Sequence, residues 1–126
     1  MPDKLYEYAV VRVVPRVERE EFLNIGVILF CKNQQFLELK FNLNEEKLNT
    51  FSSEMDVQEL QENLQSWQQI CAGEKDSGTI GAMPIASRFR WLTATRSSVL
   101  QTSKVHSGLC QNAQKTLERL FEELVL

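Results

Sequence analysis

The chain lacks any apolar run that approaches the roughly 20 residues needed to cross a bilayer. Its first residues, MPDKLYEYAV, have neither the basic start nor the long apolar stretch of a secretory signal. We therefore expect a cytoplasmic protein that makes no membrane contact. Apolar residues make up 43% of the 126 residues and charged residues 25%, a balance that indicates a folded chain and suits one domain over residues 1–126.

Cysteine and histidine are scarce, which narrows the possible chemistry. Cys31, Cys71 and Cys110 are widely spaced and form no C-x-x-C pair, so we expect reduced thiols rather than disulfides. The single histidine, His106, is close to Cys110, but no third group that would orient a Cys/His nucleophile is identifiable. We expect no metal site and no cofactor, and the pattern favours a non-enzymatic role while leaving catalysis open.

Apolar alternation predicts three strands in the first third of the chain. The segments Tyr6–Pro15, Phe22–Cys31 and Phe36–Phe41 are rich in β-branched and aromatic residues, and Pro15 ends the first of them. Gly26, inside the second, suggests a β-bulge or a close backbone approach. The KNQQ turn joins the second and third segments into a hairpin.

The central and last parts of the chain predict helices and two more strands. Asn44, Asp56 and Asn112 are suited to cap three helices, of which the second reaches Ala72 and stops at Gly73. The segment Glu74–Pro84 has the composition of a mobile loop. Strands are expected at Arg88–Thr95 and Ser98–Val105. The fold class is therefore α+β, with a mostly antiparallel sheet of about five strands and two or three helices packed against it.

A long segment without acidic residues stands out in a chain of net charge −3. No Asp or Glu occurs between Asp76 and Glu118. In the strand expected at Arg88–Thr95, Arg88 and Arg90 would share one face while Phe89 and Trp91 pointed into the core. A neighbouring strand would add Lys104 and His106 to the same face, and guanidinium groups there would suit carboxylates or phosphates.

Further cations complete the candidate set. Arg12 is unusual in an apolar strand and needs a partner, which Glu18, Glu20, Glu21 or Glu38 could supply as well as a ligand. His106 suits either a local hydrogen bond or an acid–base or phosphate-binding role. The candidate residues for binding a ligand or partner are Arg12, Arg16, Arg88, Arg90, Arg96, Lys104 and His106.

Three stretches resemble a known family. They are YEYAVVRVVPRVEREEFLNIGVILFC, RFRWLTATRSSVLQTSKVHSGLC and TLERLFEELV, and together they span nearly the whole chain. They are similar to the bacterial family catalogued as domain of unknown function 3037, to which no activity is attached. The resemblance implies a short protein associated with a HipA-like kinase of toxin–antitoxin type, and hence an accessory or regulatory subunit.

Three functions follow as hypotheses. The first is a non-catalytic accessory domain that docks on a protein partner, such as a HipA-like kinase, through the basic sheet face. The second is a nucleic-acid or nucleotide binder, or a phosphoryl-handling enzyme, although the pI near 5.2 and the lack of a nucleic-acid signature count against it. The third is a module that binds through an exposed helix, for which the Gln-rich Asp56–Ala72 is the candidate. Arg/aromatic alternation is also what an ordinary half-exposed strand shows.

Overall fold

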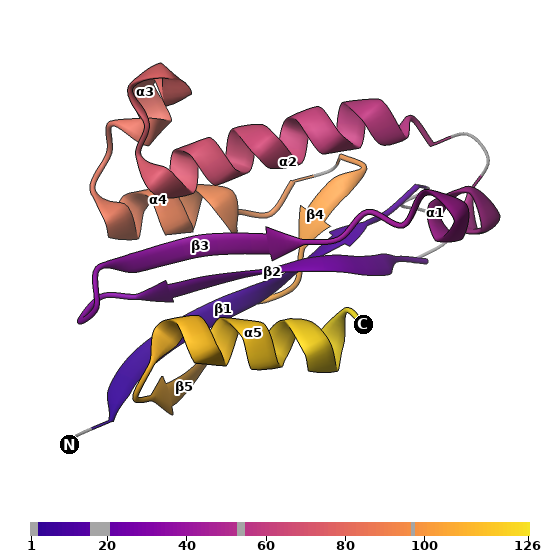
Figure 1. The fold of residues 1–126 in the computed structure, drawn as a ribbon. Helices are drawn as coiled ribbons and strands as arrows, with labels where there is room; N and C mark the ends of the chain where they lie inside the picture. The colour runs from indigo at the N-terminus through magenta and orange to yellow at the C-terminus, as the bar shows by residue number, and fades with distance from the viewer. Residues whose placement is uncertain (1–2, 16–20, 53–54, 97) are drawn as a thin grey trace.

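A five-stranded antiparallel sheet forms the centre of the molecule in the computed structural model, which describes residues 3–15, 21–52, 55–96 and 98–126 (Figure 1). Its middle strand, β1, pairs with β2 along one side, and β2 pairs with β3. Along its other side β1 pairs with β4 at one end and with β5 at the other. The strands are β1 Lys4–Val13, β2 Leu23–Cys31, β3 Phe36–Phe41, β4 Leu100–Thr102 and β5 His106–Cys110.

The first three strands confirm the sequence prediction, whereas the strand expected at Ser98–Val105 is wrong in extent. The chain pairs with β1 only over β4, leaves the ladder, and returns as β5. At the interruption, the Ser103 amide donates to the Val10 carbonyl and the Ser103 hydroxyl accepts from the Val10 amide, both at 2.8 Å. At this point a side-chain oxygen takes the place of a backbone acceptor in the ladder. Two short strands, β4 and β5, therefore pair with β1 instead of one long strand.

Helices cover both faces of the sheet. Helices α2 and α4 pack on one face, and α5 lies on the opposite face (Figure 1). We call these the α2 face and the α5 face. The helices are α1 Glu45–Phe51, α2 Val57–Ala72, α3 Gly78–Gly81, α4 Ile85–Leu92 and α5 Ala113–Leu124, with a 3-10 turn, η2, at Lys75–Ser77.

The predicted helix caps are confirmed in detail. The side chains of Asn44, Asp56 and Asn112 each accept from the backbone amide three residues further on, at 3.0–3.1 Å. Gly73 ends α2 in the left-handed conformation, with φ of 67°, which other residues adopt at a cost. Local sequence therefore sets the ends of these helices.

The strand expected at Arg88–Thr95 is wrong, because Ile85–Leu92 is the helix α4. Ile85, Phe89 and Leu92 are spaced by four and three residues, so one helical face carries them into the core of the α2 face. The segment expected to be a mobile loop, Glu74–Pro84, contains η2 and α3. The α+β class is confirmed, but the described chain has five helices rather than two or three.

Alternation along β1 divides the core into two clusters. Ala9, Val11 and Val13 are fully buried in the cluster under α2 and α4. Tyr6 points the other way and joins the cluster under α5. Since successive side chains alternate between faces, the even-numbered Arg12 belongs to the α5 face. This assignment decides which of the candidate cations can act together.

Two glycines allow close contacts within the sheet. A β-carbon on Gly26 would lie 2.8 Å from the Lys40 carbonyl oxygen, and the register of β1 against β2 shifts next to it. Of the two alternatives predicted at Gly26, the close backbone approach is confirmed, and the bulge lies at the next residue, Ile25. A β-carbon on Gly108 would lie 2.7 Å from the Tyr6 hydroxyl oxygen and 2.8 Å from its ring, because Tyr6 packs across β5 at this point.

No helix in the described part of the chain is long and apolar enough to cross a membrane.

Candidate functional site

Arg88 connects two helices. Its Nη1 donates to the carbonyl oxygens of Ile70 and Cys71 at 2.9 and 2.8 Å, and its Nε donates to that of Met83 at 3.0 Å. Ile70 and Cys71 belong to the last turn of α2, where helix carbonyls lack partners within the helix. A cation there also interacts favourably with the negative end of the helix dipole. Arg88 therefore serves the packing of α4 against α2.

Arg90 forms an ion pair with Glu7 of β1, 83 residues away in sequence. Its Nη2 lies 3.0 and 2.9 Å from the two carboxylate oxygens. The Arg90 side chain is 57% exposed and that of Glu7 22% exposed, so water weakens the pair. No Asp or Glu lies near Arg90 in the sequence, and Glu7 of β1 provides the carboxylate instead. The shared face expected for Arg88 and Arg90 does not form, because both residues lie on a helix.

Arg96 contacts two indole rings. Its guanidinium carbon is 4.8 Å from the Trp67 ring centroid and 5.0 Å from that of Trp91, and its Nη2 donates to the Trp91 carbonyl at 2.7 Å. Burial lowers the pKa of Arg96 from its usual value. Trp67 belongs to the core under α2, so the arginine fastens the segment after α4 to that helix.

Arg12 differs from these three arginines, because it has a buried side-chain nitrogen that no described residue bonds. Its guanidinium carbon lies 4.0 Å from the ring centroid of Phe22, which is 48% exposed. Its Nε is buried and has no hydrogen-bond partner among the described residues. Burial lowers the pKa of Arg12 from its usual value. A desolvated, incompletely bonded cation beside an exposed aromatic ring is costly for a fold and useful for binding.

Lys104 and His106 are exposed. They lie along the edge of β1 that pairs with β4 and β5, and β2 pairs with the other edge. His106 pairs in register with Tyr8, and their ring centroids are 5.3 Å apart. Both rings are therefore on the α5 face, the face that also carries Arg12. Lys104 is exposed in the segment between β4 and β5. Arg16, the remaining candidate, lies outside the described residues.

The structure thus divides the candidate residues between two faces. Arg88, Arg90 and Arg96 are on the side of α2 and α4, where each contacts an acceptor, a carboxylate or an aromatic ring of its own fold. Arg12 and His106 are on the α5 face, where α5 packs mainly on β2 and β3. We define the Arg12 strip as Tyr8, Arg12, Phe22 and His106. Tyr8 and Arg12 are four residues apart on one strand, so the strip is roughly 13 Å long.

The geometry argues against a cysteine nucleophile activated by His106. All three thiols are buried. Burial raises the pKa of Cys71 to about 12 and also raises that of Cys110, so both remain protonated near neutral pH. His106 and Cys110 are at opposite ends of β5, roughly 13 Å apart, which separates the pair that the sequence suggested. The described residues contain no group of three or more His, Cys, Asp or Glu side chains that could hold a metal ion.

Two aromatic residues of the strip were missed in the sequence. Tyr8 and Phe22 were counted as ordinary members of strands, because aromatic residues are common there. The even spacing of Tyr6, Tyr8 and Arg12 did indicate a shared face. Only the structure shows that α5 covers one part of that face and leaves Phe22 exposed.

These features define a small α+β domain whose single antiparallel sheet has helices on both faces. A family model matches residues 8–125, nearly the whole chain, and is described as "Protein of unknown function (DUF3037)". The chain belongs to this family, as the resemblance in its sequence predicted. No curated protein and no solved structure matches it.

Proposed function

We propose that the chain is a non-catalytic accessory domain that docks on a partner protein through the Arg12 strip. The observation that carries the proposal is the Arg12–Phe22 pair, a partly desolvated guanidinium that stacks on an exposed ring and whose Nε has no partner among the described residues. Arginine and aromatic residues dominate the binding energy of protein interfaces. This surface replaces the sheet face built on Arg88 and Arg90, whose side chains are engaged within the fold.

The strip suits a partner surface that is acidic at one point and apolar around it. A partner carboxylate would pair with the half-buried guanidinium of Arg12, while the rings of Phe22 and Tyr8 supply apolar area. The family resemblance suggests a HipA-like kinase as the partner, which would make this domain an accessory or regulatory subunit. Complementary charge would then set the orientation and rate of docking.

Charge reversal at Arg12 tests the proposal. The tagged chain is purified with a HipA-like kinase of its source cell, and we expect Arg12→Glu to reduce the retained kinase by about tenfold or more. Arg119→Glu is the matched control, because Arg119 pairs with Glu123 on exposed positions of α5. Phe22→Ala tests the same surface without introducing a charge. All variants must melt like the parent chain.

The experiment distinguishes a wrong choice of interface from a wrong choice of partner. If Arg12→Glu and Phe22→Ala retain as much kinase as Arg119→Glu does, the Arg12 strip is not the interface. If the parent chain retains no kinase, the assigned partner is wrong.

The alternative is nucleic-acid binding by the same strip. The tilted Tyr8–His106 pair and the Phe22 ring are aromatic groups on a sheet surface beside a cation, an arrangement on which single-stranded bases can stack. The net charge of −3 weighs against it. A labelled single-stranded oligonucleotide tests this alternative, since phosphate contacts require binding to weaken steeply with salt. Absence of salt-sensitive binding removes it.

A further inference from the structure

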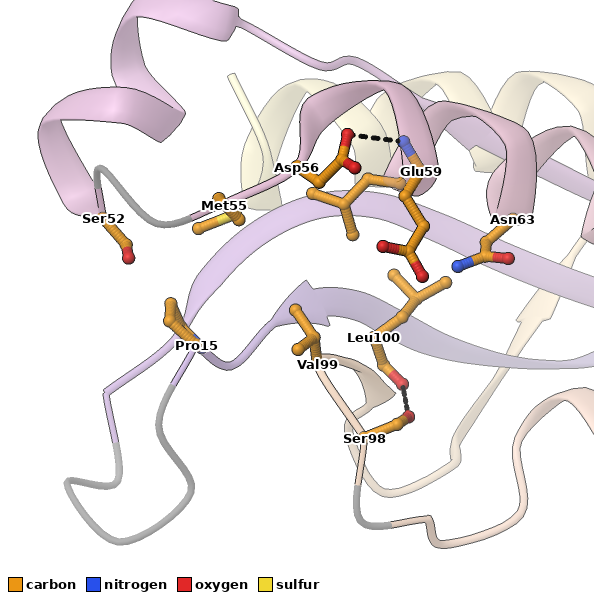
Figure 2. Close-up of a pocket in the computed structure, with 10 residues that line it drawn as sticks. Pro15, Ser52, Met55, Asp56, Glu59, Asn63, Ser98, Val99 and Leu100 are labelled. Carbon is orange, nitrogen blue, oxygen red and sulfur yellow. Dashed lines mark hydrogen bonds between the residues drawn. The ribbon is translucent and has the colours of Figure 1, made fainter.

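A pocket separate from the Arg12 strip opens between the start of α2 and the start of β4 (Figure 2). Its volume is about 520 Å³, within the range of roughly 300–1,000 Å³ typical of small-molecule sites. Leu60 and Leu100 supply buried apolar surface, and Met55 and Val99 extend it towards the opening. Ser52, Glu59 and Asn63 supply polar groups.

The described residues that line the pocket carry net negative charge. Asp56 and Glu59 line the pocket, and no described lining residue is a cation. The N-terminus of α2 contributes a positive partial charge of about half a unit, which two carboxylates outweigh. An anionic ligand would therefore be repelled, and a cationic one attracted.

Glu59 is not used by the helix that carries it. It occupies the third position of α2, from which a glutamate commonly reaches back to the amide of the capping residue. Half of that arrangement is present, since the Glu59 amide donates to the Asp56 carboxylate at 3.1 Å. The return hydrogen bond, from the Asp56 amide to the Glu59 carboxylate, is not among the hydrogen bonds of the described residues. The Glu59 carboxylate instead points into the pocket towards Leu100, and the Asn63 amide points in from one turn further along (Figure 2). No ion pair joins Glu59 to a described residue.

We propose that this pocket binds the end of an alkyl chain that carries a primary ammonium or guanidinium group. The ammonium would donate to the Glu59 carboxylate, which is a strong acceptor for a charged donor. The alkyl chain would lie against Val99 and Leu100, where it loses contact with water. Such a group occurs in free alkylamines and in the side chains of lysine and arginine.

Titration with n-pentylammonium chloride, followed by NMR of the methyl groups of Val99 and Leu100, tests the proposal. We expect saturable shifts with a Kd of about 1 mM, the scale for a ligand with so few heavy atoms. Pentanoate and pentanol carry the same chain without the cation and should bind at least about fivefold more weakly. Equal binding of all three would overturn the proposal, as would no binding of the ammonium compound.

Substitutions place the binding at this pocket. Glu59→Gln should weaken pentylammonium binding about fivefold or more, because it removes the charge and preserves the shape. Glu62→Gln is the matched control, since Glu62 is exposed on the same helix and contacts Gln58 outside the pocket. Val99→Lys should abolish binding by supplying an ammonium group from the chain itself. If Glu59→Gln binds like Glu62→Gln, the site is elsewhere and the proposal is wrong.

A second ligand identifies the natural source of the cation. A short peptide with one lysine between alanines presents the same group on a polypeptide. Stronger binding of the peptide than of pentylammonium assigns the pocket to a protein side chain, and the reverse assigns it to a free amine. The Arg12→Glu variant should bind both like the parent chain, so failure at this pocket and failure of the docking proposal are distinguishable.

Discussion

Replacement of Arg88 by methionine tests whether the most conspicuous residue of the acid-free segment stabilises the fold. Methionine preserves the unbranched side chain and the helix propensity of arginine, so the substitution mainly removes the guanidinium. Three hydrogen bonds are lost, to the carbonyl oxygens of Met83, Ile70 and Cys71. Ile70 keeps a second donor, the Gly73 amide at 3.1 Å, which leaves two acceptors to find other partners.

The magnitude follows from those contacts. A hydrogen bond that involves a charged group contributes about 1.5–3 kcal/mol, and a half-buried carbonyl that loses its donor can turn partly to water. We therefore expect Arg88→Met to lower the free energy of unfolding by about 2–4 kcal/mol. Arg90→Met is the matched control, because its exposed ion pair with Glu7 is worth about 1 kcal/mol or less.

Urea unfolding followed by circular dichroism measures both variants. With an m-value of about 2 kcal/mol/M, Arg88→Met should lower the urea midpoint by about 1–2 M, and Arg90→Met by about 0.5 M or less. Unchanged m-values would show that the comparison is one of stability alone. If the two variants have the same midpoint, the three carbonyl contacts contribute little, and the structural role assigned to Arg88 is wrong.

Two further predictions concern a close contact at Gly108 and the buried thiol of Cys71. Gly108→Ala should lower stability by about 1–3 kcal/mol in the same urea assay, because the new methyl group meets the Tyr6 ring, while Ser107→Ala on the exposed side of β5 should change it little. In native protein at pH 8, Cys71 should resist a thiol reagent that modifies it rapidly in urea, because burial raises its pKa to about 12. Folding raises this pKa above 9.0, so its contribution to stability should be present below pH 9 and be lost towards pH 12, and Cys71→Ala should remove that dependence.

Most of the secondary structure was predictable because local patterns determine it. Strand alternation and side-chain caps such as Asn44 and Asp56 act within a few residues, and the structure confirms them. Helix α4 was missed because Arg88–Trp91 alternates like a strand over four residues. The longer spacing of Ile85, Phe89 and Leu92 is helical, and the core of the α2 face stabilises that choice.

The candidate site was less predictable because partners come from distant parts of the chain. Glu7 neutralises Arg90 from a strand 83 residues away, and no local pattern announces such a contact. Gly108 lacks a β-carbon where Tyr6, from a strand at the other end of the chain, packs against it, and no local pattern indicates that contact. Alternation along β1 is enough to predict which face of the sheet carries Arg12. Its stacking on Phe22, in contrast, depends on the bulged register of β1 and β2.

The arginines of the acid-free segment therefore have structural roles, which leaves Arg12 as the candidate for binding a partner. Arg88, Arg90 and Arg96 each contact carbonyls, a carboxylate or indole rings of their own fold, so each already has a structural role. Arg12 retains an unbonded Nε among the described residues and lies beside an exposed ring. Structural and binding roles should consequently separate by experiment. Arg88→Met should lower the urea midpoint and, under conditions where the protein is folded, retain its partner, whereas Arg12→Glu should lose the partner and keep its midpoint.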